Sequence, residues 1–103
     1  PTTYLDLTHQ IEVLDLLFEL NQTHKTTILM VLHELNLACR YAHQMIAVKE
    51  GTVFRQGPPE EILDVEMIEA VFGMQCHLDR DPLFGTPMCV PKGKGRKVLE
   101  LHD

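Results

Sequence analysis

Serine is absent from this sequence of 103 residues, and so are long apolar runs. Without serine, nucleophilic acyl transfer would need a cysteine or threonine on a sharp turn beside a histidine, but the three cysteines lie within predicted helices or strands. Their odd number and wide spacing suit reduced thiols in a cytosolic protein better than a disulfide framework. No apolar run reaches the roughly 18 residues of a membrane span. These absences argue against a serine hydrolase, a disulfide-rich domain and a membrane-spanning segment.

Acidic residues are in excess, with 15 of them against nine basic ones, which gives a formal net charge of -6. This balance argues against a general nucleic-acid binder. The hydrophobic share of 45% is that of a globular protein, and the length is that of one domain or part of one. Because the sequence opens with Pro1 and not with Met, we expect it to be a piece of a longer protein.

The six histidines and three cysteines raise the question of a metal site. Zinc sites use close pairs such as C-x2-C or H-x3-H, because one turn then presents two ligands. Here the only close cysteine and histidine are Cys76 and His77, whose side chains would point to opposite faces of a strand. We therefore expect no metal site, and we interpret Cys39 as a small core residue.

The first half of the chain predicts a helix, a buried strand and a second helix. An apolar stripe at helical spacing predicts the first helix from Asp6 or Thr8 to about Leu20, with a face broad enough to pack on a sheet. An almost unbroken apolar run predicts a strand over 26–32, and apolar residues on both faces are typical of a parallel sheet. Helical spacing returns over 34–42.

The second half predicts shorter elements. A strand over 44–49 and a returning strand over 52–56 predict an antiparallel hairpin. The remaining predicted elements are a helix that starts at 57–61, a short helix that ends at Gly73, and strands near 74–78 and 88–90. Residues 92–103 are predicted to be a basic, flexible tail.

His33 lies at the carboxyl end of the predicted strand, directly before the second helix. Ligands bind at that edge of open α/β sheets. A helix N-terminus there offers free N–H groups and a positive dipole end to a phosphate. On the residues alone, a single histidine in this place is more often a structural hydrogen-bonding group than a catalyst.

The stretches P-T-T-Y-L-D, V-L-H-E-L-N-L-A-C-R-Y-A and T-V-F-R-Q-G-P-P-E-E-I-L follow one another along the chain. Together, up to about Val90, they resemble the C-terminal part of an ATP-binding cassette (ABC) ATPase. P-T-T-Y-L-D at the start resembles the segment that follows the Walker B carboxylates and ends in the D-loop. V-L-H, which ends at His33, resembles the switch-histidine strand, and M-I-A-V-K-E-G with T-V-F-R-Q-G-P-P-E-E-I-L fits the strand pair and helix that follow it. N-L-A-C-R-Y-A and the late V-F-G resemble subunits that serve importers of the iron-siderophore, haem or cobalamin type.

The resemblance implies an α/β fold class, the RecA-like fold of P-loop NTPases. Residues 1–91 would be the C-terminal part of the nucleotide-binding domain, with a parallel core strand flanked by helices and a small antiparallel β-hairpin. It also implies that His33 is the switch histidine, which donates a hydrogen bond to the γ-phosphate of ATP. Asp6 would belong to the D-loop at an ATPase dimer interface, together with Thr3, Tyr4 and Leu5.

Other motifs of such an ATPase are missing from the sequence. It has no G-x-x-x-x-G-K-[ST] phosphate loop, no L-S-G-G-Q signature and no Walker B carboxylates before Pro1. We therefore predict that a longer protein hydrolyses ATP with Mg2+ to drive import, for ferric siderophores or a related metal chelate. This chain alone is predicted to be inactive and to hold no cofactor, and no metal ligand is assigned in it.

The resemblance implies a second ATPase subunit and a membrane permease as partners, with no nucleic acid. It places the protein in the cytoplasm, on the inner face of the cell membrane through the permease. If 26–32 is a central strand, its bare edge favours self-association of this chain. Two alternatives remain open: a stand-alone α/β interaction or regulatory domain without ATPase activity, and an ABC-type ATPase that serves DNA repair or translation.

Overall fold

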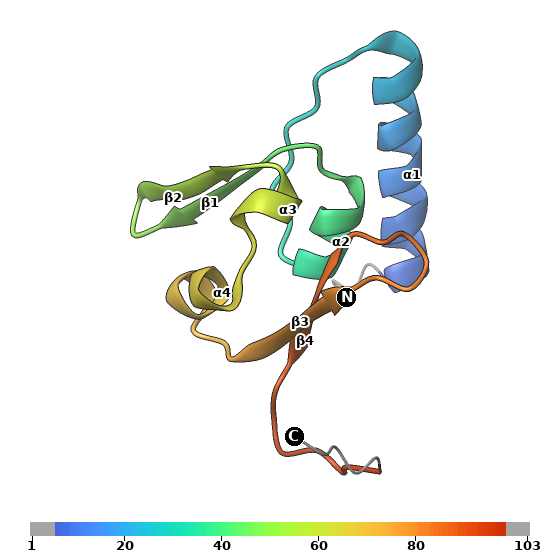
Figure 1. Ribbon diagram of the computed structural model, residues 1–103. Coiled ribbons are helices and arrows are strands. Elements are labelled where there is room, and N and C mark those ends of the chain that lie inside the picture. Colours follow the sequence, from blue (N-terminus) through green and yellow to red (C-terminus); the bar gives the residue numbers. More distant parts are fainter. Residues whose placement is uncertain (1–5, 99–103) are drawn as a thin grey trace, which may run out of the picture.

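The computed structural model describes residues 6–98, which form helices around two short antiparallel hairpins (Figure 1). In chain order the elements are α1 (Leu7–His24), α2 (Leu35–Tyr41), β1 (Met45–Lys49), β2 (Thr52–Gly57), α3 (Pro59–Ile62), α4 (Val65–Phe72), β3 (Cys76–Arg80) and β4 (Pro87–Pro91). The sheets are β1–β2 and β3–β4, each of two strands. None of the helices in the described part of the chain has the length and hydrophobicity needed to cross a membrane.

The start of α1 is set by Asp6, one of the two predicted caps. Its carboxylate accepts a hydrogen bond from the backbone N–H of His9 at 2.8 Å, which satisfies one of the free donors of the first turn. The helix continues to His24, four residues beyond the predicted end at Leu20. The polar residues 21–24 therefore extend the helix and do not break it.

The end of α1 fixes the direction of the chain that follows. Lys25 adopts a left-handed conformation with φ of 57°, and its N–H donates to the carbonyl of Asn21 at 2.9 Å. The side-chain amide of Asn21 donates in turn to the carbonyl of Thr26 at 2.7 Å. Two hydrogen bonds thus hold the chain as it leaves the helix.

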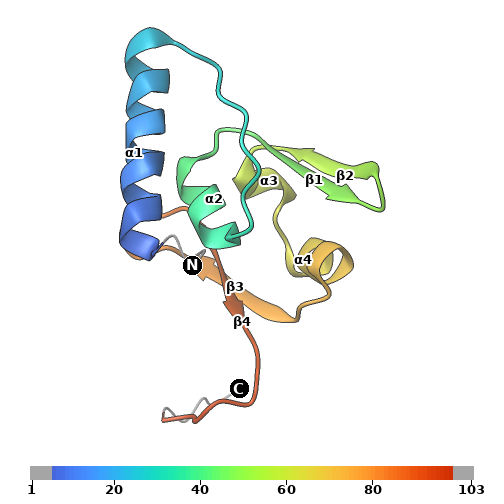
Figure 2. The same cartoon turned by 180° about the vertical axis from the view of Figure 1, so that it is seen from behind.

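The predicted buried strand over 26–32 is wrong for this chain. These residues form neither helix nor strand, and Leu29 and Val31 are 87% and 84% exposed. Figures 1 and 2 show the segment as an open connection from the end of α1 back to α2. A buried parallel strand needs hydrogen-bonding neighbours, and both sheets of the described residues are antiparallel hairpins that leave this segment unpaired.

The broad apolar face of α1 likewise does not pack on a sheet. Leu14 is its only buried residue among those described. The helix touches the rest of the fold through Phe18, whose ring lies edge-on to Tyr41 at 6.3 Å and stacks on His43 at 5.7 Å. The Tyr41 hydroxyl also donates to the Asp15 carboxylate at 2.6 Å. Burial, and then this hydrogen bond, raise the pKa of Tyr41 to about 12.

The β1–β2 hairpin agrees with the prediction. Its register runs from Met45 opposite Gly57 to Lys49 opposite Thr52, with a shift that leaves Phe54 without a partner. A guanidinium joins the hairpin to the following helices, because Arg55 donates to the carbonyl of Ile62 at 3.0 Å and to the carboxylate of Asp64 at 2.7 Å. That contact lowers the pKa of Asp64.

The core lies between α2, α4 and the β3–β4 hairpin. Its buried side chains are Cys39, Leu63, Met67, Ile68, Cys76 and Cys89. The predicted role of Cys39 as a small core residue is confirmed, since it is buried and forms no disulfide, like the other two cysteines. Helix α4 ends where predicted, at Gly73, in a left-handed conformation with φ of 66°.

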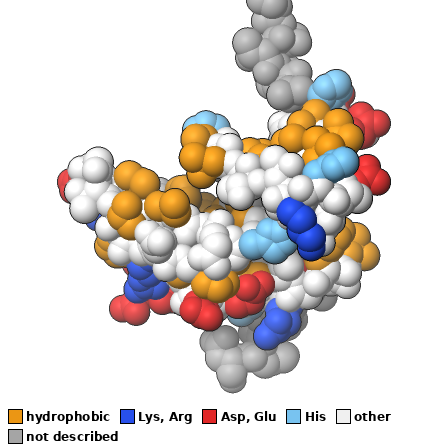
Figure 3. Space-filling model, turned by 90° about the horizontal axis from the view of Figure 1, so that it is seen from above, with side chains coloured by type: hydrophobic (Ala, Val, Ile, Leu, Met, Phe, Trp, Pro, Cys, Tyr) orange, Lys and Arg blue, Asp and Glu red, His pale blue; other side chains and the backbone are white. Residues whose placement is uncertain are grey.

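Hydrophobic side chains also remain on the surface. Seen from above, they lie open both over the β1–β2 hairpin and over α1 (Figure 3). On the hairpin they come from the strand faces opposite to the core, and on α1 from the broad stripe. Independently of the view, the large hydrophobic side chains that are exposed on α1 and on the β1–β2 hairpin include Leu7, Leu16, Phe18, Leu20, Ile46, Val48 and Val53.

Candidate functional site

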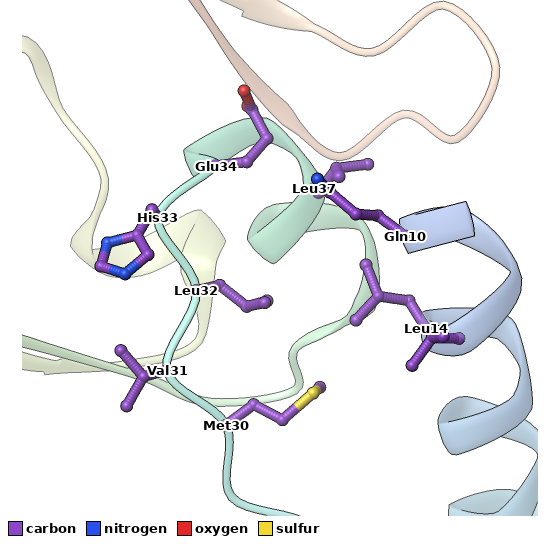
Figure 4. Close-up of a pocket in the computed structure, with 9 residues that line it drawn as sticks. Gln10, Leu14, Met30, Val31, Leu32, His33, Glu34 and Leu37 are labelled. Atoms are coloured by element: carbon purple, nitrogen blue, oxygen red, sulfur yellow. The ribbon is translucent and has the colours of Figure 1, made fainter. Parts of the chain in front are cut away.

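His33 lies at the rim of a hollow of about 480 Å3 between α1, the segment before α2, and α2 itself. Most of the lining is apolar. In Figure 4, Met30 and Leu32 point toward Leu14 of α1, whereas the His33 ring points to the other side of the segment. The segment is therefore locally extended, with neighbouring side chains on opposite sides. His33 itself is exposed.

One backbone N–H group at the N-terminus of α2 is bonded within the chain. Glu34 is the N-cap residue, and its carboxylate accepts a hydrogen bond from the N–H of Asn36 at 3.0 Å. The Glu34 carboxylate thus occupies one of the N–H groups that were predicted to face a phosphate, and its negative charge disfavours an anion at this helix end. What His33 contributes is an imidazole that is open to solvent, at a place where the chain turns into a helix.

The D-loop residues can be followed only in part. Thr3, Tyr4 and Leu5 lie outside the described residues. Asp6 is exposed and caps α1, so its carboxylate has a local role in this chain. Gln10, one turn further along α1, lines the same hollow as His33, while Asp6 is not part of that lining.

Metal-binding and nucleophilic side chains do not gather elsewhere in the described part of the chain. Residues 6–98 contain no group of three or more histidines, cysteines or carboxylates that could hold a metal ion. Burial raises the pKa of the Cys39 thiol to about 11, so it is protonated at neutral pH and a poor nucleophile. Burial likewise raises the pKa of Cys89 to about 11.

Sequence reasoning missed how α2 is attached to the β3–β4 hairpin. At one end, the Asn36 side chain bonds to the backbone of Cys89. At the other end, Arg40 forms an ion pair with the buried Asp81, and its guanidinium lies 4.4 Å from the ring centre of Phe84. Asn36 and Cys89 are 53 residues apart in the sequence, and Arg40 and Asp81 are 41 apart. A local sequence pattern therefore cannot predict either contact.

A nucleotide with Mg2+ needs backbone N–H groups and a lysine around its phosphates, and a carboxylate or hydroxyl on the metal. The sequence has no phosphate loop to supply the first, and residues 6–98 hold no cluster suited to the second.

Comparison with known proteins gives one consistent result. The chain is 61% identical over 98 residues to the petrobactin import ATP-binding protein FpuD of Bacillus anthracis, which covers 95% of the chain and 36% of that protein. It is 56% identical over 100 residues to the probable siderophore transport system ATP-binding protein YusV of Bacillus subtilis (strain 168), which covers 97% of the chain and 36% of that protein. It is 50% identical over 94 residues to the ferric enterobactin transport protein FepC of Escherichia coli (strain K12), covering 91% and 35%.

The fold comparison agrees. A solved ABC transporter, described as of metal-chelate type and inward-facing, superposes with a TM-score of 0.74 at 26% identity, covering 91% of this chain and 38% of that one. No protein-family model matches the sequence. The chain spans about a third of the length of the curated relatives it matches.

These matches confirm the resemblance drawn from the sequence: the chain corresponds to the C-terminal part of an ABC ATP-binding subunit. Within that class, its relatives are the ATP-binding proteins of siderophore and hemin import systems. The fold class is confirmed at the same level, as helices with small antiparallel hairpins that superpose on an ABC transporter.

Proposed function

We propose that this chain is the C-terminal portion of an ATP-hydrolysing subunit that drives import of ferric siderophores or a related metal chelate. The observation that supports it most is the 61% identity over 98 residues to a petrobactin import ATP-binding protein. Relatives named for achromobactin and enterobactin are 60% and 50% identical over 94 residues each. The shared class is therefore proposed, and not one particular chelate.

In this proposal His33 is the switch histidine. A ring N–H would donate a hydrogen bond to the γ-phosphate and help to hold the attacking water. The exposure of His33 supports this role, because its ring is open to a partner outside the described residues. Asp6 would lie in the D-loop, with Thr3, Tyr4 and Leu5, at the interface between two ATPase subunits.

ATP and Mg2+ belong, in this proposal, to the longer protein. Phosphoryl transfer depends mostly on positioning and on stabilising the developing charge, which a phosphate loop and metal ligands provide. This sequence holds neither motif. We therefore infer that the chain alone hydrolyses no ATP and retains no nucleotide.

The partners follow from the same class. The longer protein would pair with a second ATPase subunit and bind a membrane permease on the cytoplasmic face of the membrane. The chain alone would self-associate through the apolar segment 26–32, where Leu29 is 87% exposed. The remaining part of the domain would cover this segment and the stripe of α1.

A chimera tests the proposal. The 98 residues of FpuD that align with this chain are replaced by it, and ATP turnover is measured for the chimera and for the 103-residue chain. We expect turnover by the chimera only. His33→Ala should lower kcat by roughly 100-fold, the cost of removing one group that stabilises the transition state. His77→Ala, at an exposed histidine in β3, is the matched control and should leave kcat unchanged.

Two results would contradict the proposal. One is ATP turnover by the purified 103-residue chain that His33→Ala abolishes, because the chain would then be an enzyme by itself. The other is a folded chimera without turnover, which would favour the alternative of a stand-alone interaction or regulatory domain.

A further inference from the structure

The side chain of Asn36 completes the open edge of the β3–β4 hairpin. Its Oδ1 accepts from the N–H of Cys89 at 2.7 Å, and its Nδ2 donates to the carbonyl of Cys89 at 3.1 Å. Cys89 stands opposite Leu78 in the hairpin. In an antiparallel pair the N–H and C=O of one residue point to the same side, so these groups of Cys89 point away from β3. The amide therefore pairs with β4 as one residue of a third strand would.

Asn36 also belongs to the turn that carries His33. Its own backbone N–H donates to the carboxylate of Glu34 at 3.0 Å, which is the N-cap bond of α2. His33 directly precedes Glu34 in the chain. One residue thus joins two sets of hydrogen bonds, one that shapes the turn after His33 and one that attaches this turn to the hairpin.

The chain on the other side of His33 is held much less firmly. Residues 25–32 form no helix or strand, and Val31 is 84% exposed. By contrast, Asn36 is half-buried, and the residues that follow it, Leu37 to Cys39, are buried against the hairpin. The position of His33 is therefore determined mainly from its C-terminal side.

We propose that Asn36 is a positioning residue for His33, and that through it the β3–β4 hairpin fixes where the imidazole lies. The catalytic consequence rests on the proposed function, in which His33 meets the γ-phosphate. Loss of the paired bonds would free the turn and misplace the imidazole, while ATP would still bind to groups elsewhere in the longer protein. Turnover would then fall more than affinity.

A purely structural role for Asn36 is the alternative, and Asp81 supplies the control for it. Arg40, which lies seven residues after His33 near the C-terminal end of α2, pairs with Asp81 and so attaches that end of the helix to the same hairpin. Asp81→Asn keeps the shape of the side chain but removes its charge. It loosens the hairpin without touching the turn at His33, so an effect of general loosening would appear equally in both variants.

The first test uses the 103-residue chain itself. Wild type, Asn36→Leu and Asp81→Asn are compared by hydrogen exchange of the backbone amides of residues 36 and 38, which both bond to Glu34, and by the NMR signals of the His33 ring. For Asn36→Leu we expect exchange roughly tenfold faster, because two hydrogen bonds are lost, and a shifted His33 signal. Asp81→Asn should leave both unchanged. If Asn36→Leu does not fold, Asn36→Asp, which keeps the acceptor for the Cys89 N–H, takes its place.

The second test uses the FpuD chimera. Asn36→Leu should lower kcat about tenfold with KM for ATP changed less than about threefold, and Asp81→Asn should lower neither by more than about twofold. Equal effects of the two variants on His33, or no effect of Asn36→Leu, would overturn the proposal. A chimera that is inactive with Asn36 in place would reject the proposed function instead, while the first test would still decide the role of Asn36.

Discussion

The region from α2 to β4 contains a buried apolar cluster, although several of its large side chains are exposed, whereas the described region from α1 to residue 34 buries only Leu14. In the first region Met67 and Ile68 are 1% and 0% exposed, at the centre of a cluster that draws on two helices and a hairpin. In the second region Leu29 is 87% exposed, although it lies in the most continuous apolar run of the sequence. Hydrophobicity is similar in the two regions, yet burial is not.

The difference shows what each region needs in order to pack. The hairpins pair with neighbours close in sequence, and α2 and α4 cover them, so the described residues supply all sides of that core. The segment 26–32 has the composition of a strand with neighbours on both edges, and residues 6–98 supply none. The chain spans only about a third of the relatives it matches, so most of their fold lies beyond what it contains.

The largest expected effect is on the free energy of unfolding, when one aliphatic side chain is shortened in each region. Ile68→Ala should lower the free energy of unfolding by about 2–5 kcal/mol, because it opens a cavity in a closed core. Leu29→Ala should change it by less than about 0.5 kcal/mol, because the side chain is already in water. Urea unfolding followed by circular dichroism measures both. Equal losses would mean that the two regions pack alike.

Self-association of the chain should depend on the exposed segment 26–32 and not on the buried core. Leu29→Lys should weaken self-association of the chain by roughly tenfold or more, because a charge would have to be buried in an apolar contact. The matched control is Leu83→Lys in the β3–β4 turn, where the leucine is 79% exposed and lies outside the apolar segment. Sedimentation velocity reports the outcome. A monomeric wild-type chain, or equal effects of the two lysines, would contradict the role of the segment.

The smallest expected effect is the pH dependence of stability that the ion pair of Asp81 with Arg40 produces. The hydrogen bond from Arg40 holds the pKa of Asp81 below its usual range. A carboxyl whose pKa is lower in the folded state stabilises the fold above its unfolded pKa of about 4, and this contribution is lost as pH falls through the folded value. Asp81→Asn should therefore destabilise the chain at pH 7, and the difference from wild type should shrink below about pH 4. A difference that is constant with pH would show that the charge contributes nothing.

Local signals predicted much of the fold. Asp6 caps α1, Gly73 ends α4 in a left-handed conformation, and the turn at Gly51 joins the β1–β2 hairpin. Each of these depends on residues within about a turn of one another. The strand over 26–32 was predicted wrongly because its pattern describes a neighbourhood that these residues do not provide. The pairing of β3 with β4 was not predicted, since the turn between them has no short hairpin signature.

The candidate site was predicted in part. His33 was found from its place after an apolar run and from the resemblance, and its role stays a proposal. Asn36 was missed because an asparagine near a helix start is usually a surface residue, and its partner Cys89 is distant in sequence. Arg40 and Asp81 were missed for the same reason. Contacts between residues so distant in sequence are determined by the tertiary fold, and they produce no periodic pattern in the sequence.

The left-handed turn at Lys25 has a consequence for assembly. With Asn21 bonded to the carbonyl of Thr26, and with the N-cap bond of Glu34 at the other end, the segment between them is tethered at both ends before any neighbour pairs with it. Tethering restricts its unbound conformations, so pairing costs less entropy than it would for a free peptide of equal length. If a longer protein supplies strands beside this segment, the two tethers would lower the entropic cost of pairing with them.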